Sequence, residues 1–111
     1  MTFLYLNSNK MGQGNAELGK KLLKIFLQKL AESEIKIDVI GCVNSGIELT
    51  TTGSQVLPYL EKLQSKGAKI ATCGTCLQYH NKKDDLLIGG IGSMEDTVKI
   101  MANAEKIIRP N

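Results

Sequence analysis

The feature that most constrains the fold is a regular alternation of short apolar runs with longer amphipathic segments. The runs are apolar or β-branched along most of their length, as in Phe3-Leu4-Tyr5-Leu6, and each is followed by a segment with helical periodicity. Strands of this kind are buried on both faces, which is typical of a parallel sheet covered by helices. The sequence therefore predicts one α/β domain over residues 1–111, with three layers (α/β/α) and a mainly parallel sheet of about five strands.

Periodicity and cap residues place the expected elements. Asn15 is a suitable N-cap for the first helix, and Ser93 for the last, where Met94, Val98 and Met101 have the spacing of a core-facing stripe. The expected strands are residues 2–7, 35–43, 68–73, 86–88 and 104–109, and the other two expected helices span 55–66 and 75–81.

The first helix has an apolar face and basic residues mostly off that face. The side chains expected to face the core are Leu18, Leu22, Ile25, Phe26 and Leu30. Lys20, Lys21 and Lys24 are expected to form a solvated helix face. Because no aromatic residues are interleaved with them and the net charge is only +3, nucleic acid is not an expected partner.

Cys73-Gly74-Thr75-Cys76 is the motif that most directly indicates chemistry. It follows an apolar strand and begins a helix, so both sulfurs are expected beside backbone N–H groups at a helix N-terminus. Such a position stabilises a thiolate and predicts a lowered pKa, and the thiolate is the nucleophilic form of cysteine. The alternative is that both are half-buried core thiols. Cys42, near the end of its expected strand, is interpreted as a core residue.

Two further loops each follow an expected strand, so they are expected at the same edge of the sheet. Ligands of open parallel sheets bind at this edge, outside the carboxyl ends of the strands. One contains Gly12 and Gly14, which either form a tight turn or let a ligand approach the backbone closely. The other is Asn44-Ser45-Gly46, which is either a binding loop or an ordinary turn. His80 follows Cys76 by one helical turn and is either a proton shuttle for that thiol or a surface residue.

Several other classes of site and location are disfavoured. No dinucleotide fingerprint or P-loop is present. A zinc site at Cys73, Cys76 and His80, with Cys42 as a further candidate ligand, is disfavoured because structural zinc is typical of small domains without a sufficient core, and no cofactor or metal is expected. A thioredoxin-type couple is disfavoured because Pro58 and Pro110 are badly placed for it. An odd number of cysteines, no signal sequence and no long apolar run indicate a cytoplasmic protein without a membrane segment.

Several motifs of the chain, taken in order, resemble those of one family. Residues 11–19 match M-G-x-G-x-x-E-L-G, and residues 44–50 match N-S-G-x-x-L-T. The match continues through Gly53-Ser54, Leu60, Leu63, Lys66-Gly67, the C-G-T-C-L of residues 73–77 and the A-E-K-I-I-R of residues 104–109. On these motifs nearly the whole chain resembles the DsrE-like domain at the carboxyl end of YedF proteins, which are associated with sulfur and selenium metabolism.

The resemblance implies a DsrE/flavodoxin-like fold, assembly into homo- or hetero-oligomers, and sulfur carried as a cysteine persulfide, as in some members of the wider DsrE/DsrF and TusBCD group. We therefore expect a sulfur or selenium relay at Cys73 and Cys76, as a sulfurtransferase or a sulfur-carrier subunit. The residues expected to line its pocket are Gly12, Gly14, Asn44, Ser45, Gly46, Gly74 and Thr75.

Partners follow from the same resemblance. YedF proteins carry an amino-terminal TusA-like domain with a C-P-x-P cysteine, which is missing here, so a TusA-like carrier would be a separate protein. A homo-oligomer is also expected, through the apolar segment 86–88 and Ile91. The competing hypothesis is a non-catalytic, oligomeric module whose pocket holds a small anion or nucleotide and whose thiols are incidental.

Overall fold

The structure, a computed structural model, describes residues 1–111 and is built on one five-stranded sheet. All neighbouring strands are parallel, in the order β4-β3-β2-β1-β5. The strands are β1 (Thr2–Leu6), β2 (Val39–Cys42), β3 (Lys69–Cys73), β4 (Gly90–Gly92) and β5 (Lys106–Ile108). The helices are α1 (Ala16–Glu32), α2 (Leu57–Ser65), α3 (Gly74–Tyr79) and α4 (Met94–Asn103), with 3-10 helices η1 (Asn44–Leu49) and η2 (Lys83–Asp85). The predicted three-layer α/β/α fold is confirmed.

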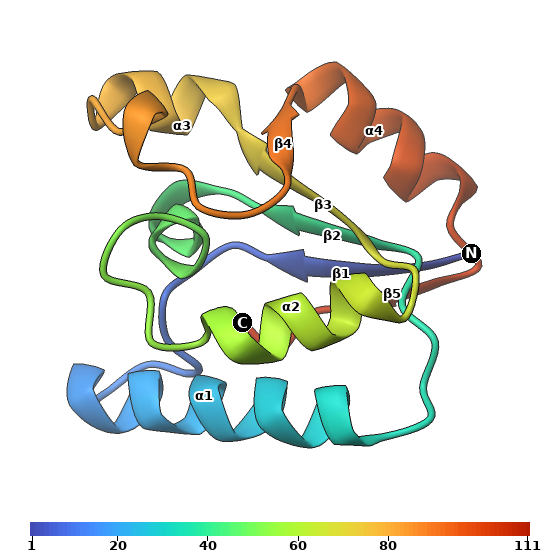
Figure 1. The fold of residues 1–111 in the computed structure, drawn as a ribbon, viewed down its shortest axis with the longest axis horizontal. Coiled ribbons are helices and arrows are strands. Elements are labelled where there is room, and N and C mark those ends of the chain that lie inside the picture. Colours follow the sequence, from blue (N-terminus) through green and yellow to red (C-terminus); the bar gives the residue numbers. More distant parts are fainter.

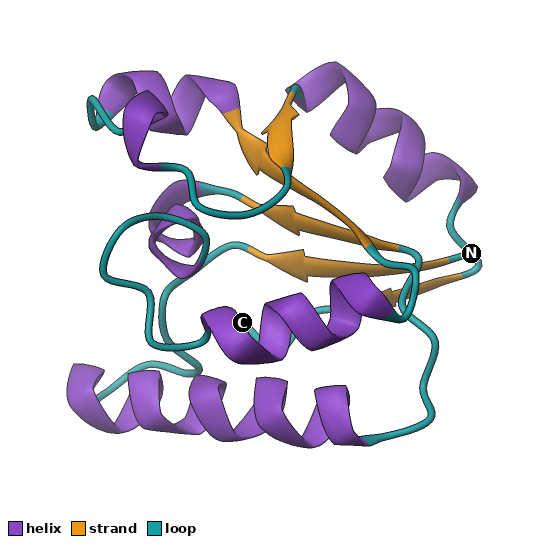
Figure 2. Ribbon diagram, in the orientation of Figure 1, coloured by secondary structure: helices purple, strands orange, loops and turns teal.

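The helices cover the sheet unequally. Figure 1 shows α1 and α2 on one face and α4 on the other, with α3 beyond the carboxyl ends of the strands. Figure 2 shows long loops at the carboxyl ends of the strands, and a further loop at the opposite end that joins α1 to β2. The main core lies under α1 and α2 and includes Leu4, Leu6, Leu23, Leu27, Ile40, Leu60 and Leu63. No helix combines the length and the apolar character that a membrane crossing would require.

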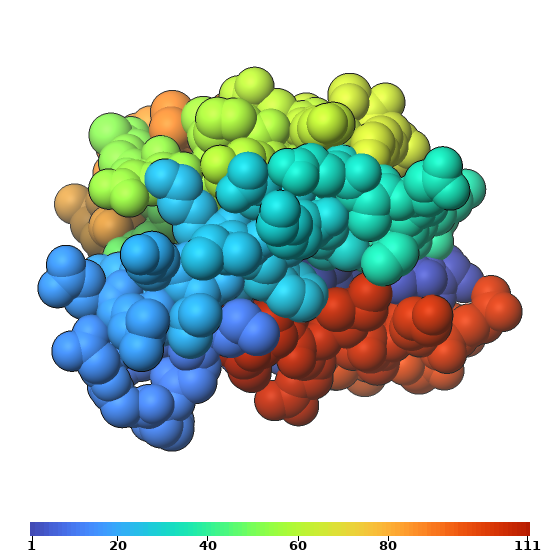
Figure 3. Space-filling model, turned by 90° about the horizontal axis from the view of Figure 1, so that it is seen from below, coloured from blue at the N-terminus to red at the C-terminus, as the bar shows by residue number.

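The last residue of the chain contacts the loop between β1 and α1, whereas the N-terminus lies at the other end of β1 (Figure 1). The side-chain amide of Asn111 donates to the carbonyl oxygens of Ser8 (3.1 Å) and Lys10 (3.3 Å), beside the start of α1 (Figure 3). The side-chain oxygen of Asn111 in turn accepts a hydrogen bond from the Asn7 N–H at 3.1 Å. These bonds hold the loop between β1 and α1 at the edge where the candidate site lies.

The buried face of α1 differs from the predicted one. Leu18, Leu22 and Ile25 are exposed, Phe26 is only half-buried, and Leu30 alone of the expected set is buried. The residues that α1 buries are Gly19, Leu23, Leu27, Leu30 and Ala31. The small residues explain the difference, because a Cβ at Gly19 would lie 3.0 Å from Lys10 Cβ and 3.1 Å from Met11 O. The helix therefore packs through the stripe that permits close approach, and its other leucines remain outside.

The prediction of a strand at 86–88 was wrong. The Leu87 N–H donates to Thr50 O, and Ile88 is buried in the main core. Gly89, with φ +73, then turns the chain against the carbonyl of Ile70, and β4 follows at Gly90–Gly92. Segment 86–88 is held by the loop before α2, so the fourth strand forms further along the chain.

The prediction that α4 packs through an apolar stripe was also wrong. Met94 and Val98 are 53% and 62% exposed, Met101 is only half-buried, and α4 buries no residue at all. The helix faces the sheet with Ser93, Thr97 and Ile100, which line a groove between the two. The apolar stripe therefore remains on the surface of the chain.

Candidate functional site

The two thiols of the Cys-x-x-Cys motif lie at the junction of β3 and α3. Cys73 ends the strand and is the N-cap of the helix, where its Sγ accepts the Cys76 N–H at 3.4 Å. Cys73 is 7% exposed and Cys76 is half-exposed, and both are free thiols. The strand-to-helix turn therefore brings the sulfurs together and leaves only Cys76 appreciably open to solvent.

Asn44 connects the neighbouring strand end to this pair. It follows β2 after one residue and begins η1, and its N–H donates to the Cys76 Sγ at 3.2 Å. Its φ is +53, a left-handed conformation that asparagine tolerates better than most residues. Asn44 thus meets the thiol pair through its backbone N–H.

Ser45 and Gly46 support this arrangement from behind. The Ser45 Oγ accepts the Asn9 N–H at 3.0 Å, which ties η1 to the loop after β1. Gly46 is buried, and a Cβ there would meet the Leu6 carbonyl oxygen at 2.2 Å. Both residues position η1 against β1, and neither contacts a thiol through a hydrogen bond.

The remaining predicted residues divide into those near the thiols and those apart from them. Gly74 lies beside Ile91, whose Cγ2 a Cβ would approach to 2.9 Å, and Thr75 is exposed in the first turn of α3. Gly12 and Gly14 have φ of +85 and +112 with open space around them, so the turn itself explains both glycines. His80 is exposed and stacks edge-on against Tyr79 (ring centroids 5.1 Å apart), with no hydrogen bond from its ring to either thiol.

The electrostatics of Cys76 differ from the sequence-based expectation. Burial raises the pKa of the Cys76 thiol, and its hydrogen bond with the Cys73 thiol raises the pKa further, whereas the Asn44 N–H lowers it. The predicted lowering of the pKa was therefore wrong for Cys76, because partial desolvation outweighs the backbone donors beside a helix of only six residues. Burial raises the pKa of Cys42 to about 12, and its prediction as a core residue is confirmed.

A groove of about 300 Å³ lies between the sheet and α4, and Cys73 is one of the residues that line it. Small side chains keep it open, among them Gly41, Ala71 and Gly92, while Ile91 and Ile100 supply apolar walls. The groove gives a narrow ligand a route to the less exposed thiol that does not pass over Cys76.

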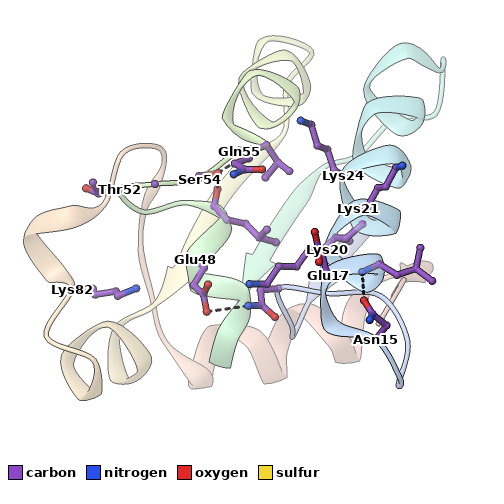
Figure 4. Close-up of a pocket in the computed structure, with 16 residues that line it drawn as sticks. Asn15, Glu17, Lys20, Lys21, Lys24, Glu48, Thr52, Ser54, Gln55 and Lys82 are labelled. Atoms are coloured by element: carbon purple, nitrogen blue, oxygen red, sulfur yellow. Dashed lines mark hydrogen bonds between the residues drawn. The ribbon is translucent and has the colours of Figure 1, made fainter.

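A second, larger pocket of about 780 Å³ lies between α1 and the loop that precedes α2 (Figure 4). Lys20, Lys21, Lys24 and Lys82 line it, although the first three were expected to form an ordinary solvated face. Helical spacing could have shown that the three lysines share a stripe, but not that Lys82 faces them. No three His, Cys, Asp or Glu side chains gather as a metal site anywhere in the chain.

Comparison with known proteins gives structural similarity only. No protein-family model matches the chain, and no curated protein matches its sequence. The protein of unknown function MTH1491 from Methanobacterium thermoautotrophicum shares 18% identity with a TM-score of 0.71, over 98% of this chain and 97% of that one. The YchN protein from E. coli shares 13% identity with a TM-score of 0.63, over 97% of each chain. At these identities the likeness shows a common fold.

Proposed function

We propose that this protein is a DsrE-like sulfur or selenium relay protein that carries a sulfane atom on Cys76, with Cys73 as the resolving thiol. The observation that carries the proposal is the half-exposed Cys76 Sγ, held between the Cys73 thiol and the Asn44 N–H. The family motifs and the shared fold support it independently. Cys73, 7% exposed, is too enclosed to meet a protein-bound donor first.

Loading is a thiol exchange without net oxidation or reduction. The Cys76 thiolate attacks the terminal sulfur of a donor persulfide, the sulfur–sulfur bond of the donor breaks, and the donor leaves as a thiolate. Delivery repeats this step with an acceptor thiolate, and Cys76 is then the leaving group. The Asn44 N–H, which points at this sulfur, stabilises the negative charge that returns to it.

The second thiol offers a release route. Cys73 can attack the Sγ of persulfidated Cys76, which forms a Cys73–Cys76 disulfide and expels hydrosulfide. A dithiol reductant then restores both thiols. A buried thiol and a half-buried thiol in one turn of chain favour this reaction, because no long chain segment must move to bring them together.

Partner copies and a separate carrier are part of the proposal. The exposed side chains of Ile91, Met94 and Val98, which we call the α4 face, form the apolar surface that a second copy would cover. Of the surface expected at 86–88 and Ile91, Ile88 belongs to the core of its own chain, whereas Leu87 and Ile91 are exposed. Val98→Asp should abolish any assembly seen by light scattering, and a wild-type monomer at micromolar concentration would contradict this part of the proposal.

The test of the relay is intact-mass analysis after incubation with a cysteine desulfurase and cysteine. Wild type should gain the mass of one sulfur atom, Cys76→Ser should gain none, and Cys73→Ser should load but hold the persulfide longer. Cys42→Ser is the matched control and should behave as wild type, because Cys42 is fully buried. Equal loading of all three variants would reject the relay and favour a binding module with incidental thiols.

A further inference from the structure

The pocket between α1 and the loop before α2 lies apart from the thiol pair and calls for its own explanation. Neither Cys73 nor Cys76 lines it. In Figure 4, Lys20 and Lys24 extend from α1 into the space, and Lys82 extends toward Glu48 from the opposite side. Its volume of about 780 Å³ falls within the range of roughly 300–1,000 Å³ typical of small-molecule sites.

The lysines of the pocket have no partners within the chain. The ion pairs of the protein involve Lys36, Lys99 and the amino terminus, and none involves a pocket lysine. Four lysines and two glutamates, Glu17 and Glu48, are among the residues that line the pocket, so its lining has an excess of positive charge. Such a field raises the local concentration of anions.

The spacing of the lysines adds an energetic argument. Lys20 and Lys24 are four residues apart on α1, and Lys21 and Lys24 are three apart, so like charges are neighbours on one stripe. Like-charge pairs at this spacing destabilise a helix, and the one carboxylate spaced to offset them is Glu17, three residues before Lys20 and four before Lys21. A bound polyanion would remove this repulsion, and part of its binding free energy would come from doing so.

The rest of the pocket lining offers apolar contacts and hydrogen-bonding groups in addition to positive charge. The floor contains the buried apolar side chains of Leu23, Leu49 and Val56. Across from α1, the N–H groups of Gly53 and Gln55 make no hydrogen bond within the chain. Glu48 accepts a hydrogen bond from the Asn9 amide at 3.1 Å and has a further oxygen to accept one from a ligand hydroxyl.

We infer that this pocket binds a small molecule with two or more phosphate groups and a hydroxylated organic part, the chemistry of a nucleoside polyphosphate. The lysines and the free N–H groups would hold the phosphates, and Glu48 with Asn9 would hold the hydroxyl end above the apolar floor. A concave pocket with buried apolar residues at its base fits such a ligand better than the acidic surface of another protein. The inference does not rest on the proposed sulfur chemistry, because neither thiol lines the pocket.

Calorimetry on the reduced, full-length protein at low salt tests the inference with ADP, inorganic tripolyphosphate and adenosine. Binding of ADP or tripolyphosphate that weakens with added salt, without binding of adenosine, is expected. Lys20→Gln combined with Lys24→Gln should weaken binding by about tenfold or more, since hydrogen bonds to charged groups are the stronger ones. Lys29→Gln is the matched control, because Lys29 lies on the same helix but outside the pocket.

Three results would overturn the inference. The first is an absence of heat with both phosphate compounds, and the second is an equal loss of binding in the Lys29 variant and in the double variant. The third is tighter binding of an acidic peptide than of ADP, which would assign the pocket to a protein partner. A protein with both Cys73 and Cys76 changed to serine should still bind ADP, so this test fails or succeeds separately from the relay.

Discussion

Replacing Gly46 by alanine tests the contact that positions η1 beside the thiols. The added Cβ would lie 2.2 Å from the Leu6 carbonyl oxygen and 3.0 Å from the Leu6 carbonyl carbon. Both atoms belong to backbone at the end of β1, which cannot move aside as a flexible side chain can. The backbone of η1 or β1 must therefore shift, and we expect a loss of about 2–3 kcal/mol in the free energy of unfolding, typical of overpacking in a core.

The loss should extend to function, because η1 also carries the Asn44 N–H that contacts Cys76. Urea denaturation measures the stability, and intact-mass analysis measures the rate of sulfur loading on the same sample. Gly90→Ala is the control, since no atom lies within 4 Å of a Cβ at that position. If the free energy of unfolding of Gly46→Ala lies within about 0.5 kcal/mol of that of the control, which is the range typical of neutral surface changes, the close approach of η1 to β1 is refuted.

Three further predictions concern charge and protonation. Because the pKa of Cys76 is raised, the rate of its alkylation should rise at a higher pH than the rate for an unstructured peptide thiol. Cys42, with a pKa of about 12, should be alkylated only after unfolding. Faster alkylation of Cys76 than of the peptide at pH 6.5 would contradict the raised pKa. The Thr2 N–H bond lowers the pKa of Asp38, so its stabilisation is present above the unfolded pKa of 3.8 and is lost as pH falls through the folded value. Acid titration of Asp38→Asn should therefore show a weaker pH dependence than wild type, and an identical profile would count against the bond. Lys24→Gln should raise stability at low salt by about 0.2–0.5 kcal/mol by removing like-charge repulsion, whereas no gain in urea denaturation would show that the charges do not interact.

The sheet could be predicted from sequence because continuous apolar runs are a strong signal for buried parallel strands. The segment at 86–88 has the same signal, yet its Leu87 N–H bonds Thr50 O and its Ile88 completes the core under α2. Local composition cannot distinguish an apolar strand from an apolar loop that the core requires. The decision depends on which backbone groups lie opposite, and that is a property of the whole fold.

The buried face of α1 shows a second limit. The helix has more apolar residues than one stripe can bury, and Leu18 and Leu23 are equally suitable by hydrophobicity alone. The position of the small residues decides which apolar side chains are buried, because Gly19 allows the helix to approach the loop at Lys10 and Met11. Close packing therefore selected Leu23, and Leu18, which remains outside, lines the basic pocket.

The position of the thiol pair could be predicted from the sequence, but the direction of the Cys76 pKa shift could not. Cys73 and Cys76 are brought together by one turn of chain. The loops after β2 and β3 were expected at this edge because each follows a parallel strand, and the structure makes these two strands neighbours. The direction of the Cys76 pKa shift depends on how much solvent the surrounding loops exclude, which no local motif encodes. The basic pocket likewise requires Lys82 to meet residues of α1 that lie far from it in the sequence.

Both candidate sites depend on the six residues of η1. Its first residue, Asn44, donates to Cys76, and its fifth residue, Glu48, lies in the basic pocket. Asn9 holds this short helix at two points, since its N–H donates to Ser45 and its side-chain amide donates to Glu48. Because so short an element moves as a unit, a ligand contact at Glu48 and the hydrogen bond at the Cys76 sulfur are constrained by the same backbone.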